Sequence, residues 1–502
     1  MAWHSDLEEL LGIGSPWPPE GEMTGDPHKP GRLDRYAYNK KRSEGADLKA
    51  EVVRRRVKGE VPAAVTKDLD IILNFHGALS RGFSDLLWVE QPGIYDDTAN
   101  TEAHQTFLDE VTKRSRFFTQ GAAVTMDMSR YGTGLWRVRS DDDTGLSIIE
   151  AQPTYLGTGS AWFPIHAPLN VKQITHHVLA YQQTETVVVA RRRVQRLVLT
   201  ALIFHKGSTE VRKMLITNGK IAGHLDGTDL KPKGTSVDDF LLFPVHNIEL
   251  SDTLTGIDDY RDIDGLVVEL EKRLGKVSSI LDYHAKPKMY GPAGVVQTDS
   301  MGQASVPEDM DYYPVDDGEK EPGYIVWDAG MEAVWSEIDH IMELLYIISE
   351  TSPAMFGQVK EGLAESGSAL KRLLVKPLIH VARLCNAHNE ALPHVFQAAA
   401  DLERANGVSN GVGELNVQIE WQDGLPQDMT EAVAVETQAV TARLTTRKAA
   451  AGRLYGLRGK ALDDYMAEID KEQEADKPPA PTFQVKPNPA KPGEEPEDQP
   501  EG

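Results

Sequence analysis

The sequence predicts a mixed α+β protein in which a strand-rich region lies between helical regions. From residue 63 to 118, apolar residues recur every three or four positions, which is typical of amphipathic helices. From 119 to 250 the chain reads as short strands separated by turns. From 251 onward the helical spacing returns. A chain of 502 residues is long enough to bury a sizeable core in two or more domains.

Composition places the chain among soluble globular proteins. Hydrophobic residues make up 40% and charged residues 26% of the sequence. The longest apolar runs, such as LLYII at 344–348, are far shorter than the roughly 20 residues that span a bilayer. The first residues lack the basic start and apolar core of a signal peptide, and we therefore expect synthesis and assembly in the cytoplasm. The single cysteine, Cys385, excludes an intrachain disulfide and a Cys-rich zinc site.

The formal net charge of −24 argues against a protein that grips nucleic-acid phosphates with a basic face. It does not argue against a protein that DNA must pass without being held. The charge therefore narrows the kind of DNA contact and leaves DNA as a possible partner.

The first two segments are an N-terminal arm and a mixed α+β region. Residues 1–60 are polar and interrupted by Pro and Gly, and we expect a partly disordered arm. Its basic run at 48–59 is typical of a solvated helix face. Residues 61–250 begin with two helical stretches. Two strands around an Asp-Asp-Thr-Gly turn follow, and then a meander with a tight hairpin at Asn218-Gly219.

The next segments are two long helices joined by an irregular excursion. Helical spacing predicts one helix over 251–285, capped by Ser251 or Asp252 and on the order of 50 Å long. Residues 286–328 are acidic, rich in Pro and Gly, and without periodicity. A second amphipathic helix is predicted over 329–350.

A Gly/Ser-rich loop is predicted over 351–369. Gly362 and Gly367 have the spacing of a phosphate-binding P-loop, but Ser368 and Ala369 stand where that motif needs Lys and then Ser or Thr. The loop therefore lacks both the cation and the Mg²⁺ ligand of a nucleotide site, and its glycines need another explanation.

The last part of the chain is helical apart from one strand. Residues 370–426 predict a long helix, which Pro377 and Pro393 should kink, followed by a strand at ELNVQIEW. A small helical unit is predicted over 427–472. The Pro/Glu-rich tail at 473–502 is expected to be disordered.

This succession of elements resembles the portal proteins of tailed double-stranded DNA bacteriophages, of the siphophage head-to-tail connector type. The resemblance covers about residues 70 to 470 and rests on the order of the elements more than on any one motif. In FFTQGAAVTMDM the resemblance implies a helix that passes into a strand of small residues. The stretches that carry the resemblance are NFHGALSRGFSDLLWVEQPGIY (74–95), FFTQGAAVTMDM (117–128), FPVHNIELSDTLTGIDDYRDIDGLVVELEKRLGKVSSIL (243–281), SGSALKRLL (366–374) and PQDMTEAVAVETQAVTARLTTRKAAAGRLYG (426–456).

The resemblance implies a wing at 61–250, a stem built from the two long helices, a clip at 286–328, a tunnel loop at 351–369 and a small crown at 427–472. The expected assembly is a homo-oligomeric ring, dodecameric in the family, at one vertex of the virion capsid. Such a ring nucleates procapsid assembly and conducts DNA during packaging and ejection. The implied partners are other copies of the chain, the large terminase ATPase, the head–tail adaptor, the scaffold, the major capsid protein and non-specifically passing double-stranded DNA, with no membrane.

The resemblance places the tunnel loop toward the DNA. Flexible glycines and a mixture of charges suit a loop over which a duplex must slide, because several strong phosphate contacts per subunit would arrest it. The expected loop residues are Phe356, Gly357, Gln358, Lys360, Glu361, Gly362, Glu365, Ser366 and Gly367. Cations expected at the channel or between subunits are Lys272, Arg273, Lys276, Lys371, Arg372 and Lys376, although exposed helix cations would have the same pattern.

No pattern in the sequence indicates catalysis, a cofactor or a metal. His176 and His177 are adjacent on a strand and point to opposite faces, so chelation by the pair is not expected. Asp141-Asp142-Asp143 lacks the spacing of a calcium loop and is read as a turn. Two alternatives remain, a cytoplasmic α+β enzyme with an unrecognised active site and another viral head or connector protein.

Overall fold

The structure is a computed structural model that describes most of the chain between residues 4 and 475. The stretches within this range that it does not describe are 27–28, 46–70, 98–100, 190–191, 226–231, 285–288, 293–296, 299–303, 306–311, 316–322, 325–330, 359–366, 423–428 and 458. The basic run at 48–59 and most of the tail therefore lie outside the described residues. The chain divides into two compact units, Met1–Leu425 and Pro426–Gly502.

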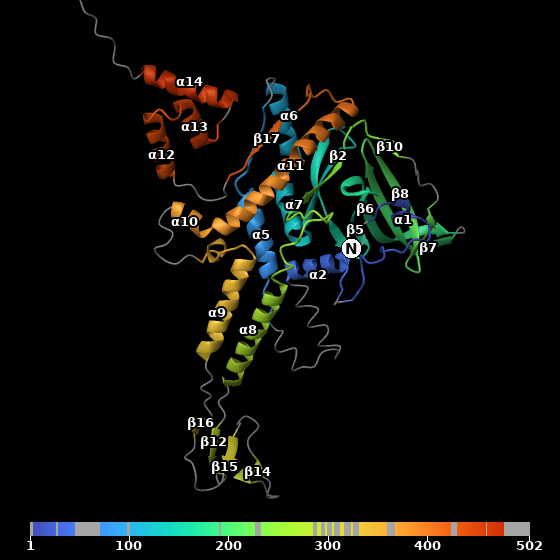
Figure 1. The fold of residues 1–502 in the computed structure, drawn as a ribbon, viewed down its shortest axis with the longest axis vertical. Helices are drawn as coiled ribbons and strands as arrows, with labels where there is room; N and C mark the ends of the chain where they lie inside the picture. Colours follow the sequence, from blue (N-terminus) through green and yellow to red (C-terminus); the bar gives the residue numbers. More distant parts are fainter. Residues whose placement is uncertain are drawn as a thin grey trace, which may run out of the picture. The chain divides into compact units, whose positions relative to one another are not determined.

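The described residues form a mixed α+β fold, as the sequence predicts (Figure 1). The helices are α1 (Leu7–Leu11), α2 (Arg32–Glu44), α5 (Phe75–Trp88), α6 (Thr101–Arg114), α7 (Phe117–Tyr131), α8 (Asp264–His284), α9 (Met331–Ile348), α10 (Gly367–Leu373), α11 (Val375–Ala405), α12 (Met429–Thr441), α13 (Arg447–Tyr455) and α14 (Gly459–Ala475), with a 3₁₀ turn, η2, at Pro353–Phe356. The strands are β1 (Gly93–Asp96), β2 (Thr133–Ser140), β3 (Ser147–Gln152), β4 (Tyr155–Gly157), β5 (Ser160–Ala167), β6 (Asn170–Val189), β7 (Arg192–His205), β8 (Ser208–Thr217), β9 (Lys220–His224), β10 (Lys233–Gly234), β11 (Leu242–His246), β12 (Met289–Pro292), β13 (Gln297–Thr298), β14 (Ala304–Ser305), β15 (Tyr312–Val315), β16 (Gly323–Tyr324) and β17 (Val417–Glu420).

An antiparallel meander is the largest sheet of the first unit. Its strands run in the order β10-β8-β7-β6-β5-β4, and β9 pairs with β8. The turn between β8 and β9 is the expected Asn218-Gly219 hairpin, in which both residues have positive φ. A second sheet, β11-β2-β3, contains the other predicted hairpin. Its turn is closed by Asp141, whose carboxylate accepts the backbone N–H of Asp143 at 2.9 Å and of Thr144 at 3.2 Å.

Two corrections concern where helices begin and end. The β-rich region was expected from residue 119, with a small-residue strand inside 117–128, but α7 continues to Tyr131. Its small residues let it lie close to α5, since the Ser80 and Ser129 hydroxyl oxygens are 2.8 Å apart and Ser84 donates to the Ala122 carbonyl at 3.1 Å. Small side chains here reflect close helix packing rather than a strand.

The helix expected from residue 251 begins at Asp264. The preceding segment instead crosses the end of α7, where Gly256 and Gly132 come so close that a Cβ on Gly256 would lie 2.1 Å from the Gly132 carbonyl oxygen. Asn247 fixes this crossing by donating its backbone N–H to that same oxygen at 2.9 Å. The apolar spacing before Asp264 is therefore that of a packed irregular segment.

The expected N-terminal arm is folded over its described residues. Leu10, Leu11, Trp17 and Leu33 are buried in a cluster with residues of β5 to β9. Because these apolar side chains are spread through a Pro- and Gly-rich segment, they do not show the periodicity from which a helix is predicted. Residues 4–26 and 29–45 thus contribute to the core that packs against the large sheet.

Helices α8 and α9 pack side by side and are joined at their far ends by the excursion at 286–328 (Figure 1). Most of this excursion lies outside the described residues. In the parts that are described, β12 pairs with β15 and β16, and β13 pairs with β14. The long helix expected after the loop is interrupted at Leu374, three residues before Pro377, and Pro393 lies inside α11.

The second unit is the small helical unit that the sequence predicts. Ala450, Ala451 and Leu462 are its buried apolar residues. The Arg453 guanidinium donates to both carboxylate oxygens of Glu436 at 2.7 Å. This pair joins α12 to α13.

Candidate functional site

The path of the chain out of α9 is fixed by hydrogen bonds. The Ser349 hydroxyl donates to the Leu345 carbonyl at 2.6 Å and lies 2.7 Å from the Thr351 hydroxyl. The η2 turn follows, and Gly357 ends it with φ of +77°. This left-handed conformation favours glycine at position 357.

The first of the expected loop residues, Phe356, packs against residues of α5 and α9. The ring of Phe356 lies 5.6 Å from the ring of Phe75 and 6.1 Å from that of Tyr346, centroid to centroid. Gln358 is exposed and Gly367 is the first residue of α10. The other expected loop residues, Lys360, Glu361, Gly362, Glu365 and Ser366, lie outside the described residues.

A charged cluster holds the end of α9 against α11. Glu350 has a positive φ of 55°, and its carboxylate contacts His380 Nδ1 at 3.0 Å and also the Arg383 guanidinium. The His380 and Arg383 contacts lower the pKa of Glu350 to about 2. The other ring nitrogen of His380 lies 3.6 Å from the carboxylate of Asp259, whose pKa is raised by burial. The start of the loop is therefore tied to α11 through carboxylates on two sides of one imidazole.

The three cations expected on α8 take part in different contacts. Arg273 joins Glu269 on its own helix at 3.0 Å and Glu337 on α9 at 2.9 Å, so it links α8 to α9. Lys272 lies 3.7 Å from Glu269 and is half exposed. Lys276 is exposed.

The cations at the start of the third helix stand beside exposed apolar side chains. Lys371 and Arg372 on α10 and Lys376 on α11 are all exposed. On the same stretch, Val375 is 48% and Ile379 is 49% exposed. Basic and apolar groups thus alternate over the first turns after the loop.

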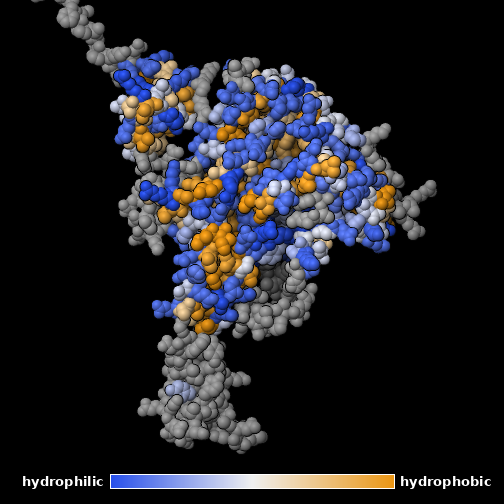
Figure 2. Space-filling model, viewed as in Figure 1, coloured by the Kyte–Doolittle hydropathy of each residue, from blue (hydrophilic) through white to orange (hydrophobic). Residues whose placement is uncertain are grey.

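Exposed apolar side chains also occur on α9, where Ile338, Ile341 and Leu345 form the buried stripe. Trp335 is 46% and Ile347 is 70% exposed, and Ile348 at the end of the helix is 44% exposed. Figure 2 shows apolar residues gathered over the α8–α9 pair and around α10. Large apolar groups left in water at adjacent places are typical of a surface that another molecule covers.

Sequence analysis missed this surface, although the run LLYII at 344–348 contained a signal. Successive residues of a helix point about 100° apart, so five consecutive apolar residues cannot all face one core. At least one of them has to face outward, and in the structure it is Ile347.

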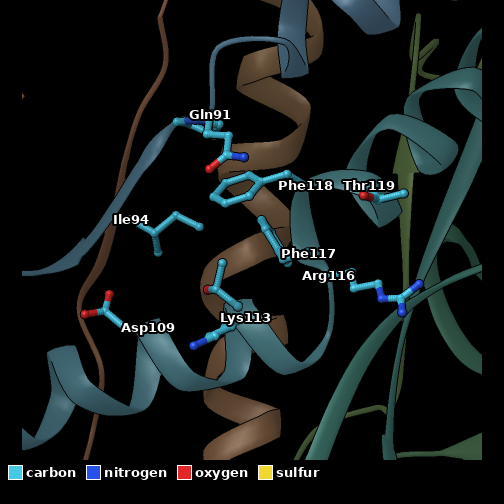
Figure 3. A pocket seen from close by; sticks show the side chains of 10 residues that line it. Gln91, Ile94, Asp109, Lys113, Arg116, Phe117, Phe118 and Thr119 are labelled. Carbon is cyan, nitrogen blue, oxygen red and sulfur yellow. The ribbon is translucent and has the colours of Figure 1, made fainter.

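A separate groove lies between β1 and the corner that joins α6 to α7, with a volume of about 510 Å³ (Figure 3). Ile94 and Phe118 lie on opposite walls, and Asp109 and Lys113 come from α6. Arg116 projects away from the aromatic residues in this view. The charged groups do not converge on a common point, so the groove does not have the arrangement of an acid–base or anion site.

Comparisons with known proteins find no family model that matches the sequence and no curated protein that matches it. Among the residues that the structure describes, no three His, Cys, Asp or Glu side chains are grouped as metal ligands. Within the same part of the chain, no helix is both long and apolar enough to cross a membrane.

Proposed function

We propose that the chain is a portal-type ring subunit, a structural protein whose copies surround a channel for DNA at a capsid vertex. The observation that carries the proposal is the exposed apolar surface on α9 and at the start of α11, next to the loop that connects them. A monomer would leave these side chains in water, whereas a neighbouring copy would cover them.

The charges on the same helices support association between different faces of identical subunits. The exposed side of α9 carries the acidic residues Glu332, Asp339 and Glu343, while α10 and the start of α11 carry basic ones. An acidic face that meets a basic face of the next copy gives a heterologous contact, and such contacts form closed rings when the rotation closes. Family resemblance predicts twelve copies.

Electron microscopy of the purified full chain, viewed down the particle axis, tests ring formation. We expect rings with a central hole, and we expect Ile347→Ser with Ile379→Ser to release subunits. Leu156→Ser with Leu169→Ser is the matched control, because these residues are 43% and 102% exposed on strand and turn elements away from α9 and α11. Monomers that persist after co-expression with scaffold and major capsid protein would refute the proposal.

The proposed division of roles follows the order of elements. The excursion at 286–328 docks the large terminase and later the head–tail adaptor, and the loop at 351–369 meets passing DNA without reading its sequence. Deletion of residues 290–325 should leave rings that no longer bind the terminase. Rings that still bind it would place the docking surface elsewhere.

A further inference from the structure

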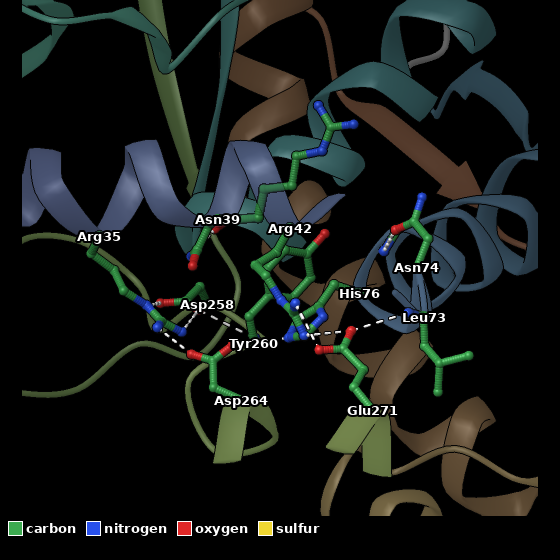
Figure 4. A network of polar contacts seen from close by, with 12 residues as sticks. Arg35, Asn39, Arg42, Leu73, Asn74, His76, Asp258, Tyr260, Asp264 and Glu271 are labelled. Carbon is green, nitrogen blue, oxygen red and sulfur yellow. Dashed lines mark hydrogen bonds and ion pairs between the residues drawn. The ribbon is translucent and has the colours of Figure 1, made fainter. Parts of the chain in front are cut away.

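Helix α2 meets the first two turns of α8 through a pair of matched charge spacings (Figure 4). Arg35 and Arg42 are seven residues apart on α2, and Asp264 and Glu271 are seven residues apart on α8. Seven residues are close to two helical turns, so each pair lies on one face of its helix. Arg35 contacts Asp264 and Arg42 contacts Glu271, so both ends of this spacing are occupied.

The contact at the first turn of α8 includes two further groups, Asp258 and His76. Arg35 also donates to the Asp258 carboxylate, at 2.8 Å, which ties the segment before α8 to the same guanidinium. The second oxygen of Asp264 lies 2.9 Å from His76 Nε2, at the start of α5. Burial lowers the pKa of His76, so the neutral ring donates to Asp264 through Nε2–H. The start of α8 is thus held from both α2 and α5.

The contact at the second turn is removed from water. The side chains of Arg42 and Glu271 are 6% and 7% exposed, and their nearest charged atoms are 3.2 Å apart. Glu271 also accepts the backbone N–H of Leu73 at 3.0 Å. A buried ion pair of this kind adds little net stability, but removing one partner leaves an uncompensated charge in the protein interior.

Helix α2 is itself fixed to the body. Arg32 pairs with buried Glu22 at 2.8 Å and donates to the Trp162 carbonyl of β5 at 3.0 Å. Asn39 donates to the Arg130 carbonyl at the end of α7 at 2.6 Å. Arg35 and Arg42 therefore extend from a helix that is held to β5 and to the end of α7.

The remaining attachment of α8 to the body is apolar and lies in the same two turns. Ile263, Val267 and Leu270 are buried in the main core. Further along α8, Val277 is also buried, and α8 packs against α9. The α8–α9 pair thus leaves the body from a short base that has apolar residues on one side and the arginine contacts on the other.

We propose that α2 sets the angle at which the α8–α9 helix pair projects from the rest of the first unit. The ion pairs Arg35–Asp264 and Arg42–Glu271 hold this angle. Apolar contacts alone would hold the first two turns of α8 in place without fixing the tilt of the helix, since hydrophobic contact is not directional. Hydrogen-bonded Arg–carboxylate pairs are directional, and long Arg side chains keep contact through small changes of angle. The proposal does not depend on ring formation.

Distance measurements by electron spin resonance on the full chain test whether these ion pairs fix the angle of α8. Spin labels at Lys276→Cys on α8 and Glu390→Cys on α11, with Cys385→Ser, report the tilt of α8 against the body. We compare Arg42→Met, Glu271→Gln and the double variant with the parent. All three variants should broaden the distribution of distances between the two labels, because each removes the Arg42–Glu271 ion pair.

Thermal unfolding of the same variants separates an effect on the angle of α8 from an effect on the stability of the protein. The single variant Arg42→Met should lower the Tm more than the double variant, which buries no unpaired charge. Arg273→Met is the matched control, because it removes a partly exposed pair between α8 and α9 and should leave the distribution unchanged. A double variant with the parent's narrow distribution would overturn the proposal, and it remains informative where Arg42→Met does not fold.

Discussion

Two buried histidines eight residues apart on α11 show how differently one side chain can be used on one helix face. His380 stacks on Phe83, with ring centroids 3.9 Å apart, and has carboxylates on both sides. His388 lies among tryptophans, and Trp136 Nε1–H donates to its Nδ1 at 3.3 Å. Its proton is therefore on Nε2, which donates to the Thr125 hydroxyl at 3.2 Å. Complete burial lowers the pKa of His388 to about 3, so this ring is neutral.

The comparison separates a histidine that fills the aromatic core from a histidine that holds the end of α9 in place. At His388 all polar neighbours are uncharged and both ring nitrogens are satisfied, which suits a fixed aromatic core. At His380 the neighbours belong to three segments, namely the end of α9, the chain before α8 and α11. Aromatic packing therefore determines the position of the His388 ring, whereas contacts with carboxylates determine the position of the His380 ring.

The largest effect is expected for His388→Ala. The change leaves a cavity among aromatic rings and removes the partner of two buried donors and acceptors, so we expect a loss of about 4 kcal/mol in the free energy of unfolding. Urea unfolding of the purified protein measures it. His394→Ala on the same helix is the control, since its ring is 65% exposed. A loss below about 1 kcal/mol would show that the cluster repacks.

The next effect is a dependence of stability on pH. Burial lowers the pKa of His177 to about 3, of His388 to about 3 and of His246 to about 4. Because the unfolded chain binds protons at these groups below about pH 6.5 and the folded chain does not, stability falls as pH falls from 6.5 toward 4. Each group contributes about 2 kcal/mol over the two units from pH 6.5 to 4.5, because the unfolded imidazole is already half protonated at pH 6.5.

The variant His388→Leu isolates the contribution of His388 to the pH dependence. Other groups contribute as well: burial raises the pKa of Asp127 to about 6, so this residue makes stability rise as pH falls. Stability of His388→Leu, measured by urea unfolding at both pH values, should fall by about 2 kcal/mol less than that of the parent. Equal pH dependence in the two proteins would mean that His388 is charged or exposed when folded.

A smaller effect is expected for His380→Ala, about 2 kcal/mol, because Asp259 loses a partner while Glu350 keeps Arg383. The informative readout is hydrogen–deuterium exchange. Amides at 349–358 should exchange faster, whereas His388→Ala should affect α5 and α7 instead. Exchange that rises equally throughout α11 would contradict the positioning role of His380.

The smallest effect is expected for Gly357→Ala. Its φ of +77° disfavours a side chain, so we expect about 1 kcal/mol of destabilisation by urea unfolding. Gly413→Ala is the control, because Gly413 has ordinary φ and open space around its Cβ position. If both changes cost the same, the left-handed turn after η2 does not hold the loop's start.

Sequence reasoning predicted elements whose signal is local. The meander from β6 to β9 followed from strand composition and the Asn218-Gly219 turn, and the helices α9 and α11 to α14 followed from apolar spacing. Leu374 interrupts the last long helix near Pro377, where a kink was expected. In each case neighbouring residues alone determine the backbone.

The missed features depend on contacts between distant segments. The length of α7 depends on how closely α5 approaches it, and the start of α8 depends on the crossing of Gly132 and Gly256. The carboxylates that meet His380 come from positions 30 and 121 residues away. No local pattern predicts such pairings, so the cluster that holds the end of α9 could not be predicted from the sequence.

The exposure of Trp335 gives the protein an optical signal of its own. Among the tryptophans that the structure describes, it is the one in the exposed class, while Trp88, Trp136 and Trp162 are buried. Dissolved acrylamide therefore has access to Trp335 on α9 and quenches its fluorescence. If a second copy covers this helix, quenching should weaken as protein concentration rises, and association can be followed in solution without attaching a label.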